Sequence, residues 1–262
     1  MRRYLLATSA VVLALALAGL VSYELSEQPT NQFFGRTVTN GPTNERVVAL
    51  TFDDGPNPPY TSRILDVLEK EHVRATFFLV GRAVQAYPSV VQREVRARHA
   101  VGNHTWDHVH LIVLRRSQIH ATLARTDAAI YAAAHVHTHL LRPPFGARDW
   151  MVMQVARKLG YTVVMWSVPL ARDWEYPPAR VIAQRILPHV SDGSIIVLHD
   201  GNRGQLCAIK HLNPHICDRS QDIEATQIII QNLKARGYSF VTIPQLITLR
   251  KGVKHTTAPE AE

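Results

Sequence analysis

Four side chains in this chain of 262 residues have the types and spacing of a hydrolytic metal site. His104 and His108 are four positions apart, which would place both imidazoles on one face of a helical turn, a geometry that suits zinc. Asp53 and Asp54 are adjacent carboxylates before a Gly-Pro turn. One carboxylate and two imidazoles make three ligands and leave open positions for water and substrate. Such a centre polarises a carbonyl and lowers the pKa of bound water, which predicts a hydrolase.

Each of these groups also has a purely structural interpretation. A single i, i+4 histidine pair is more often incidental than metal-binding, and an Asp pair before Gly-Pro also suits an exposed turn. Arg142 before a Pro-Pro-Phe-Gly segment indicates a surface loop when it is taken alone. His199 followed by Asp200 after an apolar strand is equally ambiguous. The hydrolytic interpretation therefore depends on these groups meeting in the folded chain.

Three further histidines, His135, His137 and His139, alternate along the chain and suggest a second metal site. We see no carboxylate or cysteine near them, and they precede the strand that ends at Arg142. We therefore favour a solvated strand edge or loop for this segment.

The candidate residues fall where predicted strands give way to loops. Short apolar runs indicate strands, and apolar residues three and four positions apart indicate helices. Strands and helices alternate, so we expect an α/β fold with a parallel sheet, open or closed into a barrel. In a parallel barrel the carboxyl ends of the strands share one face, where active sites are built. The predicted strands are 47–52, 75–80, 99–103, 140–142, 162–168, 194–198 and 240–243, and the predicted helices are 61–71, 90–97, 117–134, 149–159 and 226–236.

Five motifs, in this order, resemble the polysaccharide deacetylase family, which is the NodB-homology or carbohydrate esterase family 4 group. The likeness covers about residues 46–248, and its first two motifs are the most specific. The resemblance implies a distorted (β/α) barrel of the TIM-like type with fewer than eight complete units. It also implies metal-dependent removal of N- or O-acetyl groups from glycans. The motifs are Thr51-Phe52-Asp53-Asp54-Gly55, His104-Thr105-x-x-His108, Arg142-Pro143-Pro144-Phe145-Gly146, Asp173-Trp174 and Leu198-His199-Asp200.

Carried over to this chain, the resemblance assigns the metal to Asp54, His104 and His108. One divalent ion is expected, with Zn²⁺ favoured by nitrogen and carboxylate ligands and Co²⁺ or Ni²⁺ as alternatives. Asp53 would be the general base that takes a proton from the attacking water, and Arg142 would hold Asp53 in place. Attack on an amide carbonyl needs such an activated water and a group that stabilises the developing charge.

The resemblance also implies an acid and a substrate pocket. His199 would be the general acid toward the leaving amine or alcohol, and Asp173 would pair with His199. Trp174 and Leu198 would line the pocket, with Trp174 against the acetyl methyl. The backbone N–H of Phe145 would help to hold the developing oxyanion.

The chain departs from the family pattern in its third and fourth motifs. Leu170 stands where the fourth motif usually has an additional Asp, three positions before Asp173. The segment 166–174 is also one residue longer than usual. Phe145 stands where Tyr is common, a mild change if the backbone N–H does the work.

The first residues predict the compartment. Arg2 and Arg3 precede an uncharged run over residues 4–21 that is dominated by Leu, Ala and Val. Residues 1–21 are therefore expected to be a signal peptide or a membrane anchor, because the run also reaches the lower limit for spanning a bilayer. Either one makes the chain an exported protein, either secreted, periplasmic or at the cell surface.

The two cysteines agree with an exported protein. Cys207 and Cys217 lie ten positions apart in residues 204–218, which look like an insertion after the His199 motif. Disulfides form and persist outside the cytosol, so we predict a disulfide that closes this loop.

The composition suits one globular domain behind the N-terminal run. Hydrophobic residues at 46% and charged residues at 19% exclude a disordered or fibrous protein. The formal charge of +8 is compatible with an anionic glycan. The basic residues are scattered and lack interleaved aromatics, so no nucleic-acid partner is expected. Residues 22–45 are predicted to be a linker or extended segment, residues 46–250 the deacetylase domain and residues 251–262 a polar tail.

Taken together, the sequence predicts an exported metal-dependent hydrolase that removes N-acetyl or O-acetyl groups from a glycan, such as peptidoglycan or a chitin-like oligosaccharide. The bond would be an amide other than a peptide bond. Two alternatives stay open: a deformylase or cyclic amide hydrolase on the same barrel, and a non-catalytic glycan-binding module. A binding module has no need for the complete set of acids and histidines, namely Asp53, Asp54, His104, His108 and His199.

Overall fold

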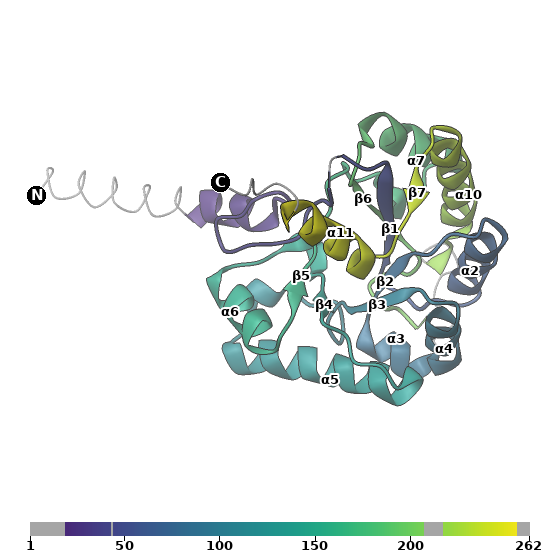
Figure 1. Cartoon of the computed structure of the whole chain (residues 1–262). Coiled ribbons are helices and arrows are strands. Elements are labelled where there is room, and N and C mark those ends of the chain that lie inside the picture. Colours follow the sequence, from purple (N-terminus) through teal and green to yellow (C-terminus); the bar gives the residue numbers. More distant parts are fainter. Residues whose placement is uncertain (1–18, 43, 207–216, 256–262) are drawn as a thin grey trace, which may run out of the picture.

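The computed structural model describes residues 19–42, 44–206 and 217–255, the last five by backbone alone (Figure 1). Six parallel strands form a curled sheet in the order β5–β4–β3–β2–β1–β6, and β7 pairs with the start of β1. Helices flank this sheet, so the predicted distorted (β/α) barrel with fewer than eight complete units is confirmed. The strands are β1 (Val47–Asp53), β2 (Thr76–Leu79), β3 (Ala100–Asn103), β4 (Leu140–Leu141), β5 (Thr162–Val163), β6 (Ile195–His199) and β7 (Ser239–Phe240).

The central strand, β1, is buried along its whole length. Val48, Leu50 and Phe52 belong to the core cluster between the sheet and its outer helices, whereas Val47 and Ala49 belong to the cluster inside the curl. Successive side chains of a strand point to opposite faces, so β1 contributes to both clusters. A strand that is covered on both faces reads as a continuous apolar run, which explains the absence of alternating polar residues here.

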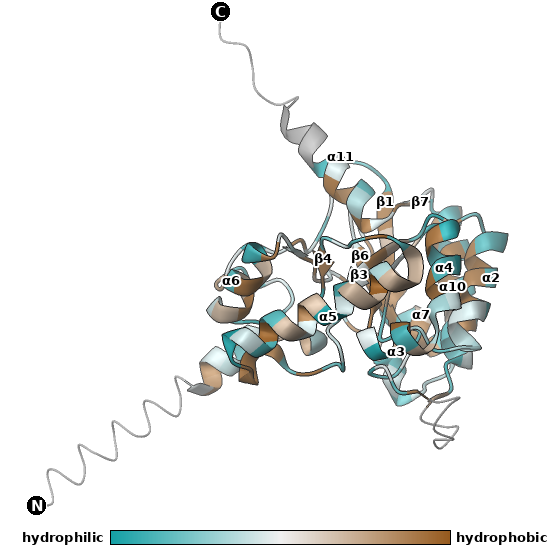
Figure 2. Cartoon of the chain, turned by 90° about the horizontal axis from the view of Figure 1, so that it is seen from below, coloured by the Kyte–Doolittle hydropathy of each residue, from teal (hydrophilic) through white to brown (hydrophobic). Residues whose placement is uncertain are grey.

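The helices pack against the sheet through their apolar sides. Figure 2 shows hydrophobic residues on the strands at the centre of the molecule and hydrophilic residues toward the outside of α2. In α2 the buried residues Ile64, Leu65 and Leu68 have helical spacing and join the outer core cluster. From β1 onward, the described helices of four or more residues are α2 (Tyr60–Lys70), α3 (Gly81–Ala86), α4 (Pro88–Arg96), α5 (Arg116–Ala134), α6 (Trp150–Lys158), α7 (Ala179–Ile186), α10 (Ser220–Ala235) and α11 (Ile243–His255).

Residues upstream of β1 fill the gap between the two edge strands, β5 and β6. Val38 forms a parallel bridge with Val164, which follows β5, and Asn40 forms an antiparallel bridge with Ser194, which precedes β6. From the other end of the domain, the Arg250 guanidinium donates to the carbonyl of Asn40 at 3.3 Å. We call this junction the seam. It ties the start and the end of the domain to both edges of the sheet.

The structure differs from the predicted elements in three ways. The strand predicted at 162–168 ends early as β5: Val164 forms a single bridge with Val38 of the seam, and the N–H groups of Ser167 and Val168 both turn to the carbonyl of Ile195 in β6. The strand predicted at 240–243 ends at Phe240, and α11 begins at Ile243, where Thr242 N–H is bound by the Gln245 side chain. Helices α3, α7 and α11 were not predicted. The first two are short, and α11 directly follows a predicted strand, so none of them shows a clear periodic pattern of apolar residues.

The segment before the seam packs against the domain. Phe34 and Thr37 are buried, and residues 19–27 form a helix. Within the described residues no helix is both long and apolar enough to cross a bilayer. The apolar run over residues 4–18 lies outside the described part of the chain, so the signal or anchor prediction stays a prediction, as do the predicted domain boundaries.

Candidate active site

The carboxyl ends of four strands bring the predicted site residues together. Asp53, at the end of β1, lies in register with His199, at the end of β6. On the other side of the sheet, Asn103 at the end of β3 pairs with Leu141 of β4, so that His104 and Arg142 follow at the same edge. Residues 146 positions apart in the chain therefore meet across neighbouring strands, as the barrel prediction required.

Asp54, His104 and His108 converge on one point. Asp54 Oδ1 lies 3.1 Å from His108 Nε2 and 3.5 Å from His104 Nε2. The spacing of the two histidines had suggested a helical turn. That prediction is wrong, because no helix carries them. They lie on a loop in which Thr105 and His108 have φ values of 68° and 58°. These left-handed residues turn the loop back and bring the ring centroids to 5.0 Å.

These three residues fit a divalent metal ion. Their ligand atoms lie within 4.8 Å of one another, and two nitrogens with one carboxylate oxygen are a donor set that zinc accepts. His104 Nδ1 lies 2.7 Å from the carbonyl of Arg142. In the tautomer that donates a hydrogen bond to this carbonyl, Nδ1 carries the proton and Nε2 keeps a free lone pair for a metal. Asp54 Oδ1 is buried without a hydrogen-bond partner, the condition of an atom whose partner is a cation.

The electrostatics of this cluster favour ligand forms of its side chains. Burial alone would raise the pKa of Asp54, but the neighbouring imidazoles, that of His108 above all, hold that pKa well below its usual range. Burial lowers the pKa of His108, against the effect of Asp54. Asp54 is thus a carboxylate and His108 a neutral imidazole at neutral pH, which are the forms that bind metal.

Asp53 is held by a fully buried arginine. Arg142 Nη1 donates to Asp53 Oδ1 at 2.7 Å and to the hydroxyl of Thr51 at 2.7 Å. The rest of the guanidinium donates to the carbonyls of Val164 and Met165. Burial lowers the pKa of Arg142, and the charge and hydrogen bond of Asp53 oppose that effect. Four of the five N–H donors of the guanidinium are used in this way, which holds the group, and with it the Asp53 carboxylate, in one position.

His199 and Asp173 form a second ion pair at the same edge. His199 Nδ1 lies 2.9 and 3.0 Å from the two oxygens of Asp173, and its backbone N–H donates to Asp173 Oδ2 at 2.8 Å. Burial would lower the pKa of His199, but the charge and hydrogen bond of Asp173, with smaller contributions from Asp54 and Asp53, raise it to about 9. His199 therefore carries a proton at neutral pH, with Nε2 left for a substrate.

Aromatic side chains flank these groups. Trp174 meets the His199 ring edge-on at 5.4 Å and is partly exposed. Phe145 has a φ of 60°, stacks on His110 at 3.9 Å and lies 4.7 Å from the His108 ring. Within the described residues the backbone N–H of Phe145 has no protein acceptor. The two rings therefore lie against the His199 and His108 rings.

Leu198 does not line this site, unlike the prediction. It is fully buried in the core cluster between sheet and helices. His199 points to the site, so the preceding residue of the strand must point to the opposite face. Leu170, at the place of the missing fourth-motif aspartate, is exposed on the loop before Asp173.

Several polar residues at this edge had no role assigned from the sequence, although Asp200 is part of the fifth motif. The carboxylate of Asp200 is buried and accepts from the Thr61 hydroxyl at 2.5 Å, and burial raises its pKa to about 7. A Cβ on Gly55 would lie 2.1 Å from Asp200 Oδ2, which is why glycine follows the Asp pair. The backbone N–H of Arg203 donates to Asp54 Oδ2 at 2.7 Å. His110 had one signal in the sequence, its position two residues after His108.

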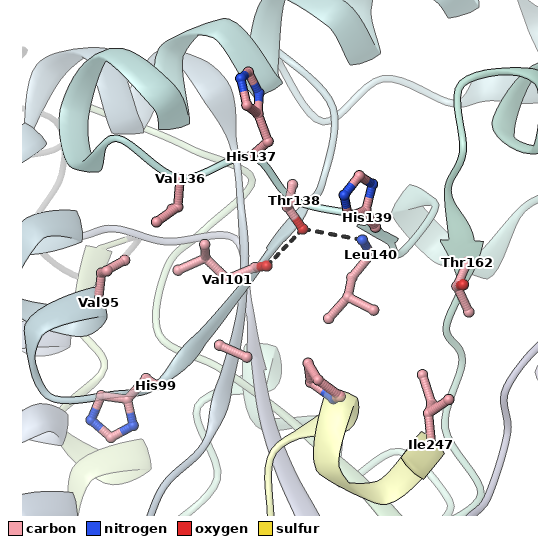
Figure 3. A pocket seen from close by; sticks show the side chains of 12 residues that line it. Val95, His99, Val101, Val136, His137, Thr138, His139, Leu140, Thr162 and Ile247 are labelled. Carbon is pink, nitrogen blue, oxygen red and sulfur yellow. Dashed lines mark hydrogen bonds between the residues drawn. The ribbon is translucent and has the colours of Figure 1, made fainter. Parts of the chain in front are cut away.

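The alternating histidines lie at the opposite end of the barrel. His135, His137 and His139 are on the loop between α5 and β4, as the loop interpretation predicted. The prediction that no carboxylate lies near them is wrong, because His137 Nδ1 is 2.6 Å from Asp127 Oδ2, on the preceding helix. Figure 3 shows His137 and His139 at the rim of a cavity of about 440 Å³ with their rings turned apart. These rings do not converge on a common ligand.

Comparison with known proteins assigns the family. A family model described as polysaccharide deacetylase matches residues 40–164. A peptidoglycan-N-acetylglucosamine deacetylase of Bacillus cereus is 34% identical over 208 residues, which are 79% of this chain and 90% of that protein. The chain belongs to the polysaccharide deacetylase family. A chitooligosaccharide deacetylase of Sinorhizobium fredii is 35% identical over 80% of this chain and 96% of that protein.

Other members of the polysaccharide deacetylase family differ in length and in activity. The chain spans 40% of the peptidoglycan-N-acetylglucosamine deacetylase PgdA of Listeria monocytogenes, to which it is 32% identical. The structure of the peptidoglycan deacetylase PdaC from Bacillus subtilis matches with a TM-score of 0.70 and 31% identity, over 82% of this chain and 96% of that one. A family pseudoenzyme from Bacillus anthracis also matches, with a TM-score of 0.70 and 29% identity, over 80% and 68% of the two chains. Family membership alone therefore does not establish catalysis.

Proposed function

We propose that this protein is a metal-dependent deacetylase that hydrolyses the N-acetyl amide of a cell-wall or chitin-like glycan. One observation carries the proposal: the Asp53–Arg142 pair and the His199–Asp173 pair lie at the same sheet edge as the Asp54, His104 and His108 cluster. A base, an acid and a cation site in one place are what amide hydrolysis needs. The relatives named as deacetylases of peptidoglycan and of chitooligosaccharides support the substrate class.

The cation site supplies the activation of water. Asp54, His104 and His108 would hold one divalent ion, and a bound divalent ion polarises a carbonyl and makes water more acidic. We favour zinc, because two imidazoles and a carboxylate suit it better than magnesium or calcium, which prefer oxygen ligands.

Asp53 acts as the general base. Arg142, which is itself held by the Thr51 hydroxyl, holds the Asp53 carboxylate beside the cation site, and this carboxylate accepts the proton that the attacking water loses. Because Arg142 binds Oδ1, the second carboxylate oxygen is left to accept this proton. A positioned base of this kind contributes about two to four orders of magnitude to a rate.

His199 acts as the general acid. Attack of water on the acetyl carbonyl gives a tetrahedral adduct, and breakage of its C–N bond requires a proton on the departing nitrogen. Asp173 keeps His199 protonated and holds Nδ1, so that Nε2 donates this proton. The products are acetate and a free amine on the sugar. The same geometry serves an O-acetyl ester, with an alcohol as the leaving group.

Phe145 and Trp174 would position the acetyl group. The unpaired N–H of Phe145 donates to the developing oxyanion, and the positive φ of this residue turns that N–H away from the helix hydrogen bonds. The indole of Trp174, beside His199, offers an apolar wall for the acetyl methyl. Replacement of a common Tyr by Phe leaves the backbone donor in place.

We further propose that the chain is exported. The relatives named for peptidoglycan deacetylation act on a polymer outside the cytosol, and the apolar run over residues 4–21 is the segment that would direct or anchor this chain. Cys217 is within the described residues and Cys207 is not, so the disulfide between them is part of this proposal.

Acetate release tests the proposed function. Purified zinc-loaded protein is incubated with peptidoglycan, with chitin oligomers and with acetylated xylan, and acetate is measured. Release from at least one N-acetylated polymer supports the proposal, and release from xylan alone would reassign the leaving group to an alcohol. Absence of acetate from all three, with the metal bound, would identify the chain as a non-catalytic module. Asp53→Asn is the control, since it keeps the fold and the cation ligands.

A further inference from the structure

Aromatic rings that a compact enzyme would bury lie exposed at the start of α6. Phe33, Trp150 and Met151 are 60%, 54% and 37% exposed. Phe33 and Trp150 pack on each other at 5.6 Å, and both pack on the buried ring of Phe34, at 5.1 and 5.8 Å. We call Phe33, Trp150 and Met151 the aromatic patch. Apolar side chains that gather on a surface, instead of lying scattered over it, mark an interaction site.

The aromatic patch lies beside the helix of residues 19–27. Arg148, two positions before the patch begins on α6, is fully buried. Its guanidinium donates to the carbonyl of Ser26, at the end of this helix, and to that of Asn31, two positions before Phe33. At 1.5 Å per residue, the first turn of the helix lies about 10 Å from Ser26. Figures 1 and 2 both show the helix leaving the domain on the side where α6 lies.

The sequence continues this helix into an apolar run. Residues 4–21 are uncharged and rich in Leu, Ala and Val, and of these residues the described ones, 19–21, are exposed. Such a run is long enough to enter a bilayer. The aromatic patch would then lie within a few turns of helix of the membrane surface. Trp and other aromatic side chains are enriched at that depth, because their rings suit the boundary between acyl chains and headgroups.

The polar surroundings of the aromatic patch are suited to anionic lipid. Arg36 and Arg157 line a groove of about 620 Å³ that also borders Trp150. Both arginines are exposed, and Lys158 follows in the sequence. The helix of residues 19–27 carries two acids, Glu24 and Glu27, so the groove and not the helix offers the positive charge. An arginine near a membrane surface is attracted by the phosphates of anionic lipids.

We propose that the aromatic patch is a lipid-contact surface. With residues 4–21 in the bilayer, Phe33, Trp150 and Met151 enter the interface, and Arg36 and Arg157 bind phospholipid phosphate. Arg148 then fixes the orientation of the domain, because it ties the helix to the loop that carries Phe145 through the carbonyls of Ser26 and Gly146. This proposal rests on retention of the N-terminal run and not on hydrolytic activity, so the two proposals fail in different experiments.

Fluorescence quenching by lipid tests the proposal on the full chain. The protein is reconstituted into phosphatidylglycerol–phosphatidylcholine vesicles with brominated acyl chains, which quench tryptophans that reach them. We expect strong quenching of the wild type and loss of most of it in Trp150→Phe. Trp174→Phe is the matched control, because Trp174 is also partly exposed but lies at the sheet edge beside His199; it should retain the quenching. We expect the wild type to be quenched more strongly in anionic vesicles than in pure phosphatidylcholine vesicles. The double variant R36Q/R157Q should lose this difference.

Several results would overturn the lipid-contact surface. Equal quenching in the wild type and Trp150→Phe would show that the aromatic patch faces away from the bilayer. The proposal would also be wrong if the mature chain, when isolated, lacked residues 1–18 and did not bind the vesicles. Loss of binding to insoluble peptidoglycan in Trp150→Phe, with no lipid quenching in the wild type, would identify the patch as a platform for sugar rings.

Discussion

Asp53 and Asp54 are adjacent in the chain, yet their carboxylates meet different partners. Asp53 Oδ1 accepts from Arg142 at 2.7 Å, whereas Asp54 Oδ1 lies 3.1 Å from His108 Nε2. The backbone is the reason: Asp53 is the last residue of β1, and Asp54 leaves the strand with a φ of 79°. One side chain is therefore placed to accept a proton and the other to hold a cation, and the following predictions separate these roles.

Asp53→Asn should remove the base and leave the cation site intact. We expect the rate of acetate release to fall by at least about two orders of magnitude, the usual contribution of a positioned base. Bound metal per chain should stay close to that of the wild type. Turnover near the wild-type value, with metal retained, would contradict the assignment.

Asp54→Asn should weaken metal binding instead. Asn tolerates a positive φ better than most residues do, so the loop should keep its shape and the loss can be attributed to the carboxylate. Metal content after dialysis should fall, and added metal should restore part of the activity. His108→Ala should lose metal in the same way, whereas His137→Ala, in the distant histidine group, is a control that should keep it. A full complement of metal in purified His108→Ala would mean that the site is elsewhere.

Arg142→Lys tests whether the shape of the guanidinium matters beyond its charge. A lysine at this position can reach the Asp53 carboxylate, but it cannot also reach the Thr51 hydroxyl and the two carbonyls that Arg142 binds. Buried acceptors left without donors cost about 1–3 kcal/mol each, so the free energy of unfolding should fall measurably. Activity should also fall while metal content is unchanged. Wild-type turnover and thermal stability in this variant would show that charge alone is sufficient.

The pH dependence should report the His199–Asp173 pair. His199 donates as an acid only while it is protonated, so activity should decline on the basic side as pH rises toward its raised pKa of about 9. Asp173→Asn removes the main charge that raises this pKa, and the basic limb should move at least about one pH unit lower. The stability of the fold should change with pH in the same direction. The His199–Asp173 pair stabilises the folded state fully at pH values below about 6.5, the pKa of an unfolded histidine, and this stabilisation is lost as the pH rises through about 9. An unmoved basic limb in Asp173→Asn would exclude His199 as the acid.

The predicted disulfide can be tested without activity. Cys207 and Cys217 would close a small loop, for which the loop-entropy model gives roughly 2–3 kcal/mol at most. Thiol titration of unreduced, unfolded protein from an oxidising compartment should find no free thiol, and reduction should release two. Two free thiols before reduction would end the prediction.

The sequence was sufficient to predict the residues that motifs and strand ends bring together. Asp54, His104 and His108 could be grouped because each follows an apolar strand, and parallel strands end at one edge. The Arg142–Asp53 pair was expected from the family resemblance and lies at 2.7 Å. The meeting of these strand ends depends only on the order and type of the elements, whereas the Arg142–Asp53 pairing came from the family motifs and the roles of these residues stay predictions.

Contacts set by loop geometry could not be predicted from the sequence. The positive φ values of Thr105 and His108 are a property of the folded loop, and the spacing of the histidines suggested a helix instead. The contact of His137 with Asp127 crosses from a loop to a helix, where distance in the sequence gives no guidance. Leu198 was assigned to the pocket by its place in a motif, although strand alternation from His199 puts it in the core.

The seam has a consequence for how this protein reaches its folded state. Val38 meets Val164, Asn40 meets Ser194, and Arg250 binds back to Asn40, so the joint that closes the barrel unites the start of the domain with residues more than 120 positions later. Contacts between residues so far apart in the chain form slowly, because a long loop must be ordered before they stabilise anything. A chain that crosses a membrane from its N-terminus would keep the barrel open until Val164 and Ser194 had emerged, and the Arg250 contact would form last. Closure of the barrel is then postponed to the compartment in which its proposed substrate lies.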